Sequence, residues 1–165
     1  MEVLPYDRQA ALAYALRWAY GRNPAYGDFS DLGGDCTNFV SQCLYAGSGV
    51  MDFTPTFGWY YLSMEDRAPA WSGVEELYRF LTGAFAKEDA GLGPFGEESD
   101  PETLQPGDVL QLGDAGGRWY HSAFVTARVG GEVLLAAHSY DSINRPLSSY
   151  EYEALRGVRI VGVHQ

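Results

Sequence analysis

A cysteine stands at the point where a loop rich in glycine and aspartate runs into a helical pattern. The loop ends with Gly33, Gly34 and Asp35, and Cys36 is the first residue of the helix. The first backbone N–H groups of a helix lack partners within the helix, and the helix dipole is positive at that end. A thiolate at Cys36 would therefore be stabilised, which makes this residue a candidate nucleophile.

The same cysteine also fits a purely structural interpretation. Apolar residues recur at helical spacing along this amphipathic segment and would form one buried face: Cys36, Phe39, Val40, Cys43 and Leu44. On that interpretation Cys36 is an ordinary core residue, because most cysteines in folded proteins are buried and unreactive. Cys43 illustrates the inert case, since it lies in the middle of the helix.

A thiol nucleophile needs a base, and a strand in the second half of the chain offers one. Alternation along residues 119–128 places four side chains on one face: Trp119, His121, Ala123 and Val125. We expect this face to pack against the Cys36 helix, so that His121 accepts the proton of the thiol.

A second histidine ends the neighbouring predicted strand, residues 132–138. A hairpin between the two strands would bring His138 beside His121, where it could orient the imidazole ring. Asp141, three residues further on, competes for that role. Both histidines also fit the structural alternative, in which they are strand residues with ordinary hydrogen-bond partners.

Helical spacing and capping residues predict three helices, over residues 6–20, from 36 to about 46, and from 72 to near Gly83. Asp7 is the expected cap of the first helix, and Ser72 with Glu75 forms a capping box for the third. Short apolar or alternating runs then predict strands over residues 108–112, 119–128, 132–138 and 158–164. Residues 51–71 are predicted as an aromatic ordered loop with at most a short strand, and residues 87–106 as a polar surface excursion.

Helices first and strands afterwards predict an α+β fold, in one domain over residues 1–165, with the Cys36 helix packed on an antiparallel sheet. The 165 residues are 46% hydrophobic and 20% charged, which suits one globular core. Because 22 acidic residues outnumber 11 Lys and Arg residues, the formal charge is −11. That charge repels nucleic acid and anionic lipid, so we expect neither as a partner.

The two cysteines lie seven residues apart on one predicted helix, about 10.5 Å at 1.5 Å per residue, which is too far for a disulfide. We therefore expect two free thiols. Three scattered histidines and two cysteines do not match a metal-ligand spacing, so we expect no metal and no cofactor. No apolar run of about 18 residues and no signal-peptide pattern occurs, so we expect a soluble chain, cytoplasmic by default.

Several short motifs follow one another along nearly the whole chain: Tyr6-Asp7-Arg8, Trp18-Ala19, Asn23-Pro24, Gly33 to Gln42, Pro106-Gly107-Asp108-Val109, Trp119-Tyr120-His121-Ser122, Ala137-His138-Ser139-Tyr140-Asp141 and Arg145-Pro146-Leu147. Together they closely resemble the bacterial putative amidase domain family. That family is similar to papain-like cell-wall hydrolases, the NlpC-type endopeptidases and the CHAP amidases.

The resemblance implies a papain-like fold in which Cys36 is the nucleophile, His121 the base and His138 the orienter. It implies hydrolysis of amide or peptide bonds through an acyl-enzyme, with stem peptides of the bacterial cell wall as the substrate class. An acyl-enzyme resolved by an amine in place of water would make the protein a transferase. A papain-like shell that binds ligands through the aromatic residues 57–61 would be a non-catalytic module.

Further residues near these positions are candidates for contacts with the substrate. Tyr26 resembles the upstream tyrosine of NlpC-type sites and would add a hydroxyl to the oxyanion hole, or else fix a loop. The other candidates are Asp35 beside the nucleophile, Trp59 and Tyr60 in the aromatic loop, and Tyr140 and Arg145 after His138. Arg145 could bind a substrate carboxylate or form a salt bridge to Asp141.

Overall fold

The computed structural model describes residues 1–85, 91–138 and 140–165. Its helices are α1 (Arg8–Trp18), α2 (Cys36–Ser48), α3 (Pro69–Ser72) and α4 (Val74–Leu81), with 3-10 turns η1 (Pro101–Thr103) and η2 (Leu147–Ser149). Its strands are β1 (Val3–Leu4), β2 (Gly93–Ser99), β3 (Val109–Gly113), β4 (Trp119–Val129), β5 (Glu132–Ala137), β6 (Ser142–Pro146) and β7 (Ala154–His164).

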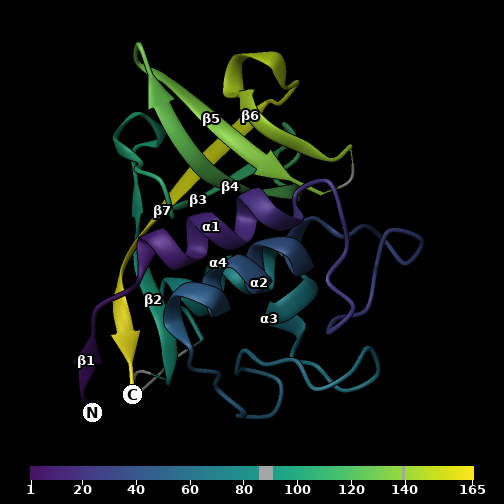
Figure 1. The fold of residues 1–165 in the computed structure, drawn as a ribbon, viewed down its shortest axis with the longest axis vertical. Helices are drawn as coiled ribbons and strands as arrows, with labels where there is room; N and C mark the ends of the chain where they lie inside the picture. Colours follow the sequence, from purple (N-terminus) through teal and green to yellow (C-terminus); the bar gives the residue numbers. More distant parts are fainter. Residues whose placement is uncertain (86–90, 139) are drawn as a thin grey trace.

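The fold is α+β, as predicted, with a seven-stranded antiparallel sheet. The strand order is β1-β7-β3-β4-β5-β6, and β2 pairs with β7. Figure 1 shows α1 crossing in front of the sheet, and both chain ends at the same corner, where β1 lies beside β7. The helices thus lie on one face of the sheet.

Helix α1 begins as its sequence predicts, since the Asp7 side chain accepts a hydrogen bond from the Ala10 N–H at 3.0 Å. Its buried side chains are the small ones, Ala11 and Ala15. On α2 they meet Gly47, where an added Cβ would lie 2.6 Å from the ring of Tyr6. Small residues on both helices therefore allow α1 to pack closely on α2.

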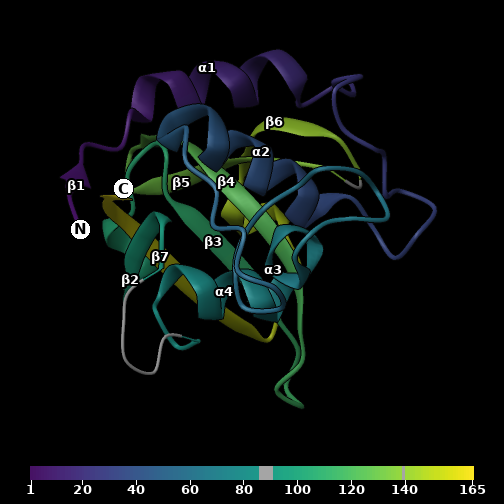
Figure 2. The same cartoon turned by 90° about the horizontal axis from the view of Figure 1, so that it is seen from below.

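Helix α2 is buried on every side from Cys36 to Leu44, so the prediction of an amphipathic helix with one buried face is wrong. Figure 2 shows why, because α2 lies between α1 and the sheet. Its polar side chains are buried with partners: Thr37 meets Ser122 at 2.9 Å, and Gln42 accepts a hydrogen bond from the Tyr14 hydroxyl. Hydrogen bonding to other elements makes their burial tolerable.

Side chains on the two faces of the sheet belong to two separate apolar clusters. Phe124 of β4 and Ala136 of β5 face the helices, together with Phe39 and Val40 of α2. The residues next to them along the strands point the other way into a second cluster: Leu110, Leu112, Ala123, Val125, Leu135 and Ala137. A residue's position along its strand therefore decides which of two environments it enters.

Several elements differ from the prediction. Ser72 ends α3 and accepts a hydrogen bond from Arg67, and Gly73 precedes α4, so the capping box is wrong. Residues 93–99 form β2 in place of the expected surface excursion, because β7 supplies a strand edge that the local sequence does not reveal. The part of that excursion at residues 86–90 lies outside the described residues. β1 and β6 were also not predicted, and residues 51–71 contain two isolated bridges and most of α3.

Candidate active site

The chain turns sharply into α2 before Cys36. Gly33 and Gly34 have φ values of 95° and 112°, which side chains larger than glycine rarely adopt. Asp35 follows as the N-cap residue, and Cys36 is the first residue of the helix. Cys36 is buried, with 8% of its surface exposed, and its Sγ lies 3.8 Å from the Thr37 hydroxyl. The predicted position of the thiol at the helix start is confirmed.

The carboxylate of Asp35 is fully buried and accepts several hydrogen bonds. Its Oδ1 accepts from the Phe29 N–H and from the Asn38 side-chain amide, both at 2.8 Å. Its Oδ2 lies 2.5 Å from Nδ1 of His138. These contacts fix the carboxylate directly beside the candidate nucleophile.

His138 follows the last residue of β5 and lies on the helix side of the sheet. Its ring stacks on Phe39 of α2 with a centroid distance of 4.1 Å, and only 1% of the residue is exposed. Nδ1 contacts Asp35, and Nε2 lies 2.9 Å from the Trp18 carbonyl oxygen at the end of α1. A carboxylate and a carbonyl both accept, so both ring nitrogens must carry hydrogen for both bonds to form. Asp35 and the end of α1 thus hold the His138 ring from both sides.

Asp141 does not orient a histidine directly. Its two oxygens accept from Nη1 and Nη2 of Arg22 at 2.9 and 3.1 Å, in a two-pronged ion pair. Arg22 comes from the loop after α1, and its Nη1 lies 3.2 Å from Nε2 of His138. Among the described residues, Arg22 thus links Asp141 to His138.

His121 lies on the opposite face of the sheet from Cys36. It pairs with Leu112 of β3, and Leu112 belongs to the cluster on the side away from the helices. Its neighbour Ser122 points the other way and contacts Thr37 of α2. The prediction that His121 faces the Cys36 helix is therefore wrong, and so is the expectation that His138 lies beside it as orienter.

His121 shares the face of Ala123 and Val125, as alternation predicts, but a β-bulge separates Trp119 from them. The register of β3 against β4 shifts between Leu112 and Gly113, which pairs with Trp119. Trp119 consequently faces the helix side, with the Arg156 guanidinium 4.1 Å from its ring centroid. Strict alternation had placed Trp119 and His121 on one face, and a bulge breaks that alternation.

The surroundings of His121 favour its neutral form. Burial, with a smaller contribution from the positive charge of Arg145, lowers the pKa of His121 to about 4. Its ring lies 5.8 Å from that of Tyr150. Its Nε2 is buried and has no hydrogen-bond partner among the described residues. This histidine has no carboxylate to charge or orient it there.

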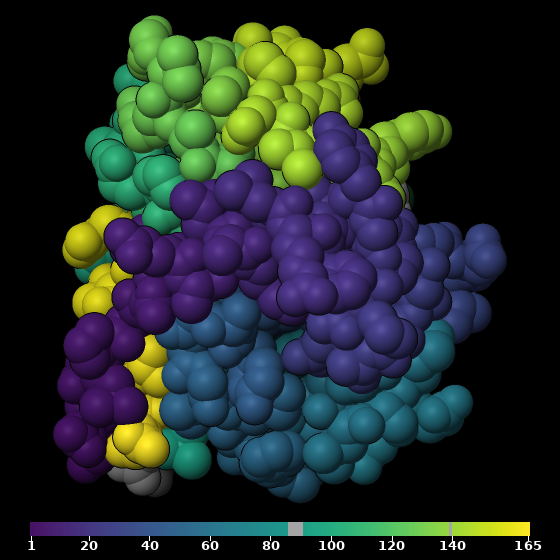
Figure 3. Space-filling model, in the orientation of Figure 1, coloured from purple at the N-terminus to yellow at the C-terminus, as the bar shows by residue number. Residues whose placement is uncertain are grey.

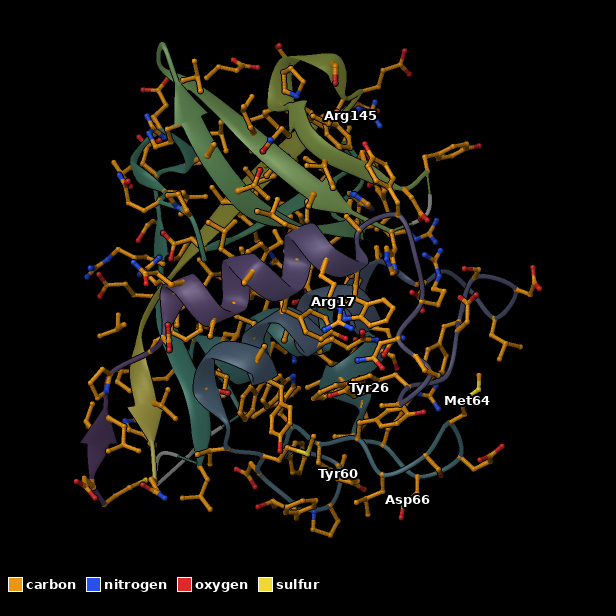
Figure 4. All side chains as sticks on the ribbon, in the orientation of Figure 1. Arg17, Tyr26, Tyr60, Met64, Asp66 and Arg145 are labelled. Atoms are coloured by element: carbon orange, nitrogen blue, oxygen red, sulfur yellow. The ribbon has the colours of Figure 1, made fainter. Side chains whose placement is uncertain are left out.

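Arg145 shares the second face with His121 and does not form the expected salt bridge to Asp141. Its guanidinium donates to the Ser149 hydroxyl at 2.9 Å and to the Ser149 carbonyl at 3.0 Å, and it lies 3.8 Å from the ring centroid of Tyr150. Figure 4 shows Arg145 at one end of the molecule and Tyr60 at the other. One small substrate cannot contact both.

The aromatic candidates divide between the core and the surface. Trp59 is completely buried and donates to the Ser41 hydroxyl at 3.0 Å, so its assignment to substrate binding is wrong. Tyr26 stacks on Trp71 at 5.8 Å, and burial raises its pKa to about 12. Tyr60 lies on the surface loop near Asp66, and Tyr140 is 92% exposed at the turn after β5. Roles for Tyr26, Tyr60 and Tyr140 in catalysis or binding stay predictions.

Sequence reasoning missed Arg22, the Trp18 carbonyl and Ser122. A signal for Arg22 existed, because it is the single basic residue between Arg17 and Arg67 in a segment that carries several aspartates. Nothing in the sequence marks a backbone carbonyl at a helix end as a histidine partner.

The described residues contain no cluster of three or more His, Cys, Asp or Glu side chains arranged for a metal ion. Within the same residues, none of the helices has the length and apolar character needed to cross a bilayer. Cys36 and Cys43 are both free thiols.

Comparisons with known proteins address the chain as a whole. The profile of the family described as "Putative amidase domain" matches residues 5–161. Among curated proteins, the uncharacterized protein YhbB of Bacillus subtilis is 36% identical over 140 residues, which cover 83% of this chain and 42% of YhbB. The uncharacterized protein YjcM of the same organism is 27% identical over 149 residues, 86% of this chain and 32% of YjcM. The chain thus spans less than half of either relative, and no solved structure matches it significantly.

Proposed function

Because the chain belongs to the putative amidase domain family, we propose that it hydrolyses amide bonds with Cys36 as nucleophile and His138 as the acid–base residue. One observation carries the assignment of roles: the buried Asp35–His138 pair at 2.5 Å lies at the N-terminus of the helix that Cys36 begins. His121, the base expected from sequence, is on the other side of the sheet.

The proposed reaction uses charges that surround the helix start. The imidazolium of His138 and the positive end of α2 stabilise the Cys36 thiolate. The thiolate attacks the amide carbonyl, a C–S bond forms, and N–H groups of the first helical turn hold the developing oxyanion. The C–N bond then breaks as His138 gives a proton to the leaving amine.

Water completes the cycle. It attacks the thioester, His138 recovers a proton, and the products are a carboxylic acid and the free thiol. For the proton donation, Nε2–H of His138 must exchange its bond to the Trp18 carbonyl for one to the leaving nitrogen. Asp35 keeps Nδ1 in place throughout, which is the part of a positioned carboxylate in cysteine and serine hydrolases.

The likeness to the NlpC and CHAP enzymes, and the papain-like fold that it implies, rest on the sequence motifs. On the same basis we propose stem peptides of the bacterial cell wall as the substrate class. The formal charge of −11 supplies no attraction to an anionic wall. Both matched relatives are more than twice as long as the aligned region.

Selective alkylation tests the nucleophile. Native protein is treated with iodoacetamide near pH 7, and the labelling of each cysteine is followed by peptide mass spectrometry. Cys36 should react at least about ten times faster than Cys43, whose pKa is raised by complete burial. Equal rates at the two cysteines in the folded protein would refute the proposed nucleophile.

A product assay tests the reaction type. The protein is incubated with a stem-peptide amide, with and without a competing primary amine, and the products are weighed. Free acid in both cases indicates a hydrolase, and an amine adduct indicates a transferase. A Cys36→Ala variant is the control, because a contaminating peptidase would remain active in that preparation.

A further inference from the structure

Arg22 is the centre of a charged cluster that joins three separate parts of the chain. Its guanidinium forms the two-pronged pair with Asp141, and its Nε lies 3.3 Å from Asp28 and 3.6 Å from Asp35. Nη1 lies 3.2 Å from Nε2 of His138. Figure 3 shows the surface segments around residues 20 and 140 meeting on one face of the molecule. The cluster thus links the loop after α1, the start of α2 and the end of β5.

The contact between Arg22 and His138 is electrostatic rather than a further hydrogen bond. Nη1 has two hydrogens, and these go to the Gly21 carbonyl at 3.0 Å and to Asp141 at 2.9 Å. The hydrogen on Nε2 of His138 goes to the Trp18 carbonyl. A guanidinium cation therefore lies close to the imidazolium, where it favours loss of the imidazolium proton.

Two charged residues lie directly against the His138 ring: Asp35 from the start of α2 and Arg22 from the loop after α1. Asp28 of that loop and Asp141 of the turn after β5 are paired with Arg22. α1 contributes the neutral Trp18 carbonyl. Three carboxylates would oppose a thiolate at Cys36, and Arg22 is the fixed cation that offsets them.

Arg22 is suited to this task because it stays charged in its position. Burial opposes its charge, but the hydrogen bond to Asp141 and the negative charges of Asp141, Asp35 and Asp28 raise the pKa of Arg22. Its planar fork fits both oxygens of Asp141, which holds the guanidinium at a fixed angle beside His138.

We propose that Arg22 is a positioning residue of the thiol site: held by Asp141, it sets the local charge so that Cys36 ionises and His138 gives up its proton at neutral pH. The inference rests on the proposed function. Arg22 does not touch the substrate, and it acts through His138 and the carboxylates around it.

The test is the pH dependence of Cys36 alkylation by iodoacetamide, measured on the full chain with Cys43 as the internal reference. Arg22→Gln removes the cation, so the midpoint of the rate–pH profile for Cys36 should move to higher pH by about one unit. Removal of an anion in Asp141→Asn should move it downward, and the double variant should return close to the wild type. Arg22→Lys, which keeps the charge without the fork, should fall between Arg22→Gln and the wild type.

A purely structural ion pair gives a different result, because Arg22→Gln and Asp141→Asn would then lower the melting temperature without moving the profile in opposite directions. That outcome, or shifts of the same sign, would overturn the proposal. Arg145→Gln is the matched control, since it removes an arginine from the other face of the sheet and should leave the profile unchanged.

NMR titration of His138 separates this proposal from the proposed function. If wild-type Cys36 reacts no faster than Cys43, the nucleophile is refuted. The ring of His138 must even then titrate at higher pH in Arg22→Gln and at lower pH in Asp141→Asn. Unchanged titration in both folded variants would refute the role of Arg22 independently of the thiol.

Discussion

Two histidines of this protein lie on opposite faces of the same sheet, and their surroundings differ in kind. His138 has a carboxylate on one nitrogen and a carbonyl on the other, and it stacks on Phe39. His121 is also largely buried, but its Nε2 has no partner in the described part of the chain, and its charged neighbour is the cation Arg145. Two buried histidines of one sheet therefore have different partners.

The comparison shows what the helix face supplies. On that face Asp35, the N-cap residue of α2, and Arg22 of the loop after α1 lie against the histidine ring. On the other face, apolar side chains and an arginine favour the neutral form. We expect the two histidines to differ in catalysis, in stability and in their response to pH.

The largest expected difference is in catalysis. His138→Ala should lower amide hydrolysis at least about 100-fold, because it removes the acid–base residue of the proposed mechanism. His121→Ala should change turnover by less than about threefold. Both are assayed on a stem-peptide substrate at a temperature where circular dichroism shows folded protein. A loss confined to His121→Ala would reverse the assignment and restore the interpretation from sequence.

The next difference is in folding stability. His138→Ala leaves the buried Asp35 carboxylate without its closest partner, and such a loss costs about 3–5 kcal/mol. His121→Phe replaces a ring whose Nε2 is unpaired, so it should cost less than about 1 kcal/mol or stabilise the protein. Urea unfolding measures both. Equal losses would mean that the two environments are energetically alike.

A third difference concerns acid. The pKa of His121 is about 4 in the folded protein, and its ordinary value, which applies to the unfolded chain, is 6.5. Between these pH values His121 therefore binds a proton more readily in the unfolded chain than in the folded protein. This contribution to stability is complete above about pH 6.5 and falls by up to about 3 kcal/mol as the pH approaches 4. Urea unfolding across this pH range should therefore show that His121→Phe loses less free energy of unfolding on acidification than the wild type does. An identical pH dependence in both proteins would contradict the neutral state of His121.

The smallest expected effect comes from Arg145. Its positive charge contributes to the low pKa of His121, so Arg145→Gln should raise that pKa by a fraction of a unit. The loss of its contact with the Tyr150 ring should cost about 0.5–1 kcal/mol. NMR titration and thermal unfolding measure the two effects. A shift of His138 in the same variant would show that the two faces are electrically coupled.

Local sequence was sufficient wherever the signal lies within a few residues. Asp7 caps α1, a glycine-rich loop precedes α2, and Cys36 begins that helix, all as predicted. The strands β3, β4, β5 and β7 were predicted because apolar alternation and glycine turns mark them directly. The α+β class and the family follow from the same order of motifs.

The candidate site was predicted in part. Cys36, Asp35, His138 and Asp141 come from sequence and gather at one place, although through contacts that were not foreseen. Arg22 was missed because an arginine on a loop has no local signature of its partner, which here lies 119 residues away. Trp59 was misassigned because an aromatic loop residue reveals its burial only in the packed structure.

The sequence by itself determined the helix that carries Cys36, the strands of the sheet and the presence of two candidate histidines. Only the tertiary structure decided which histidine shares a face with the thiol. The physical reason is that successive side chains of a strand point to opposite faces, so one bulge or one residue of register exchanges the two environments. Local propensity does not encode which face a histidine takes. That face is set by the packing of α2 against Ser122 and by the contact of His138 with Asp35.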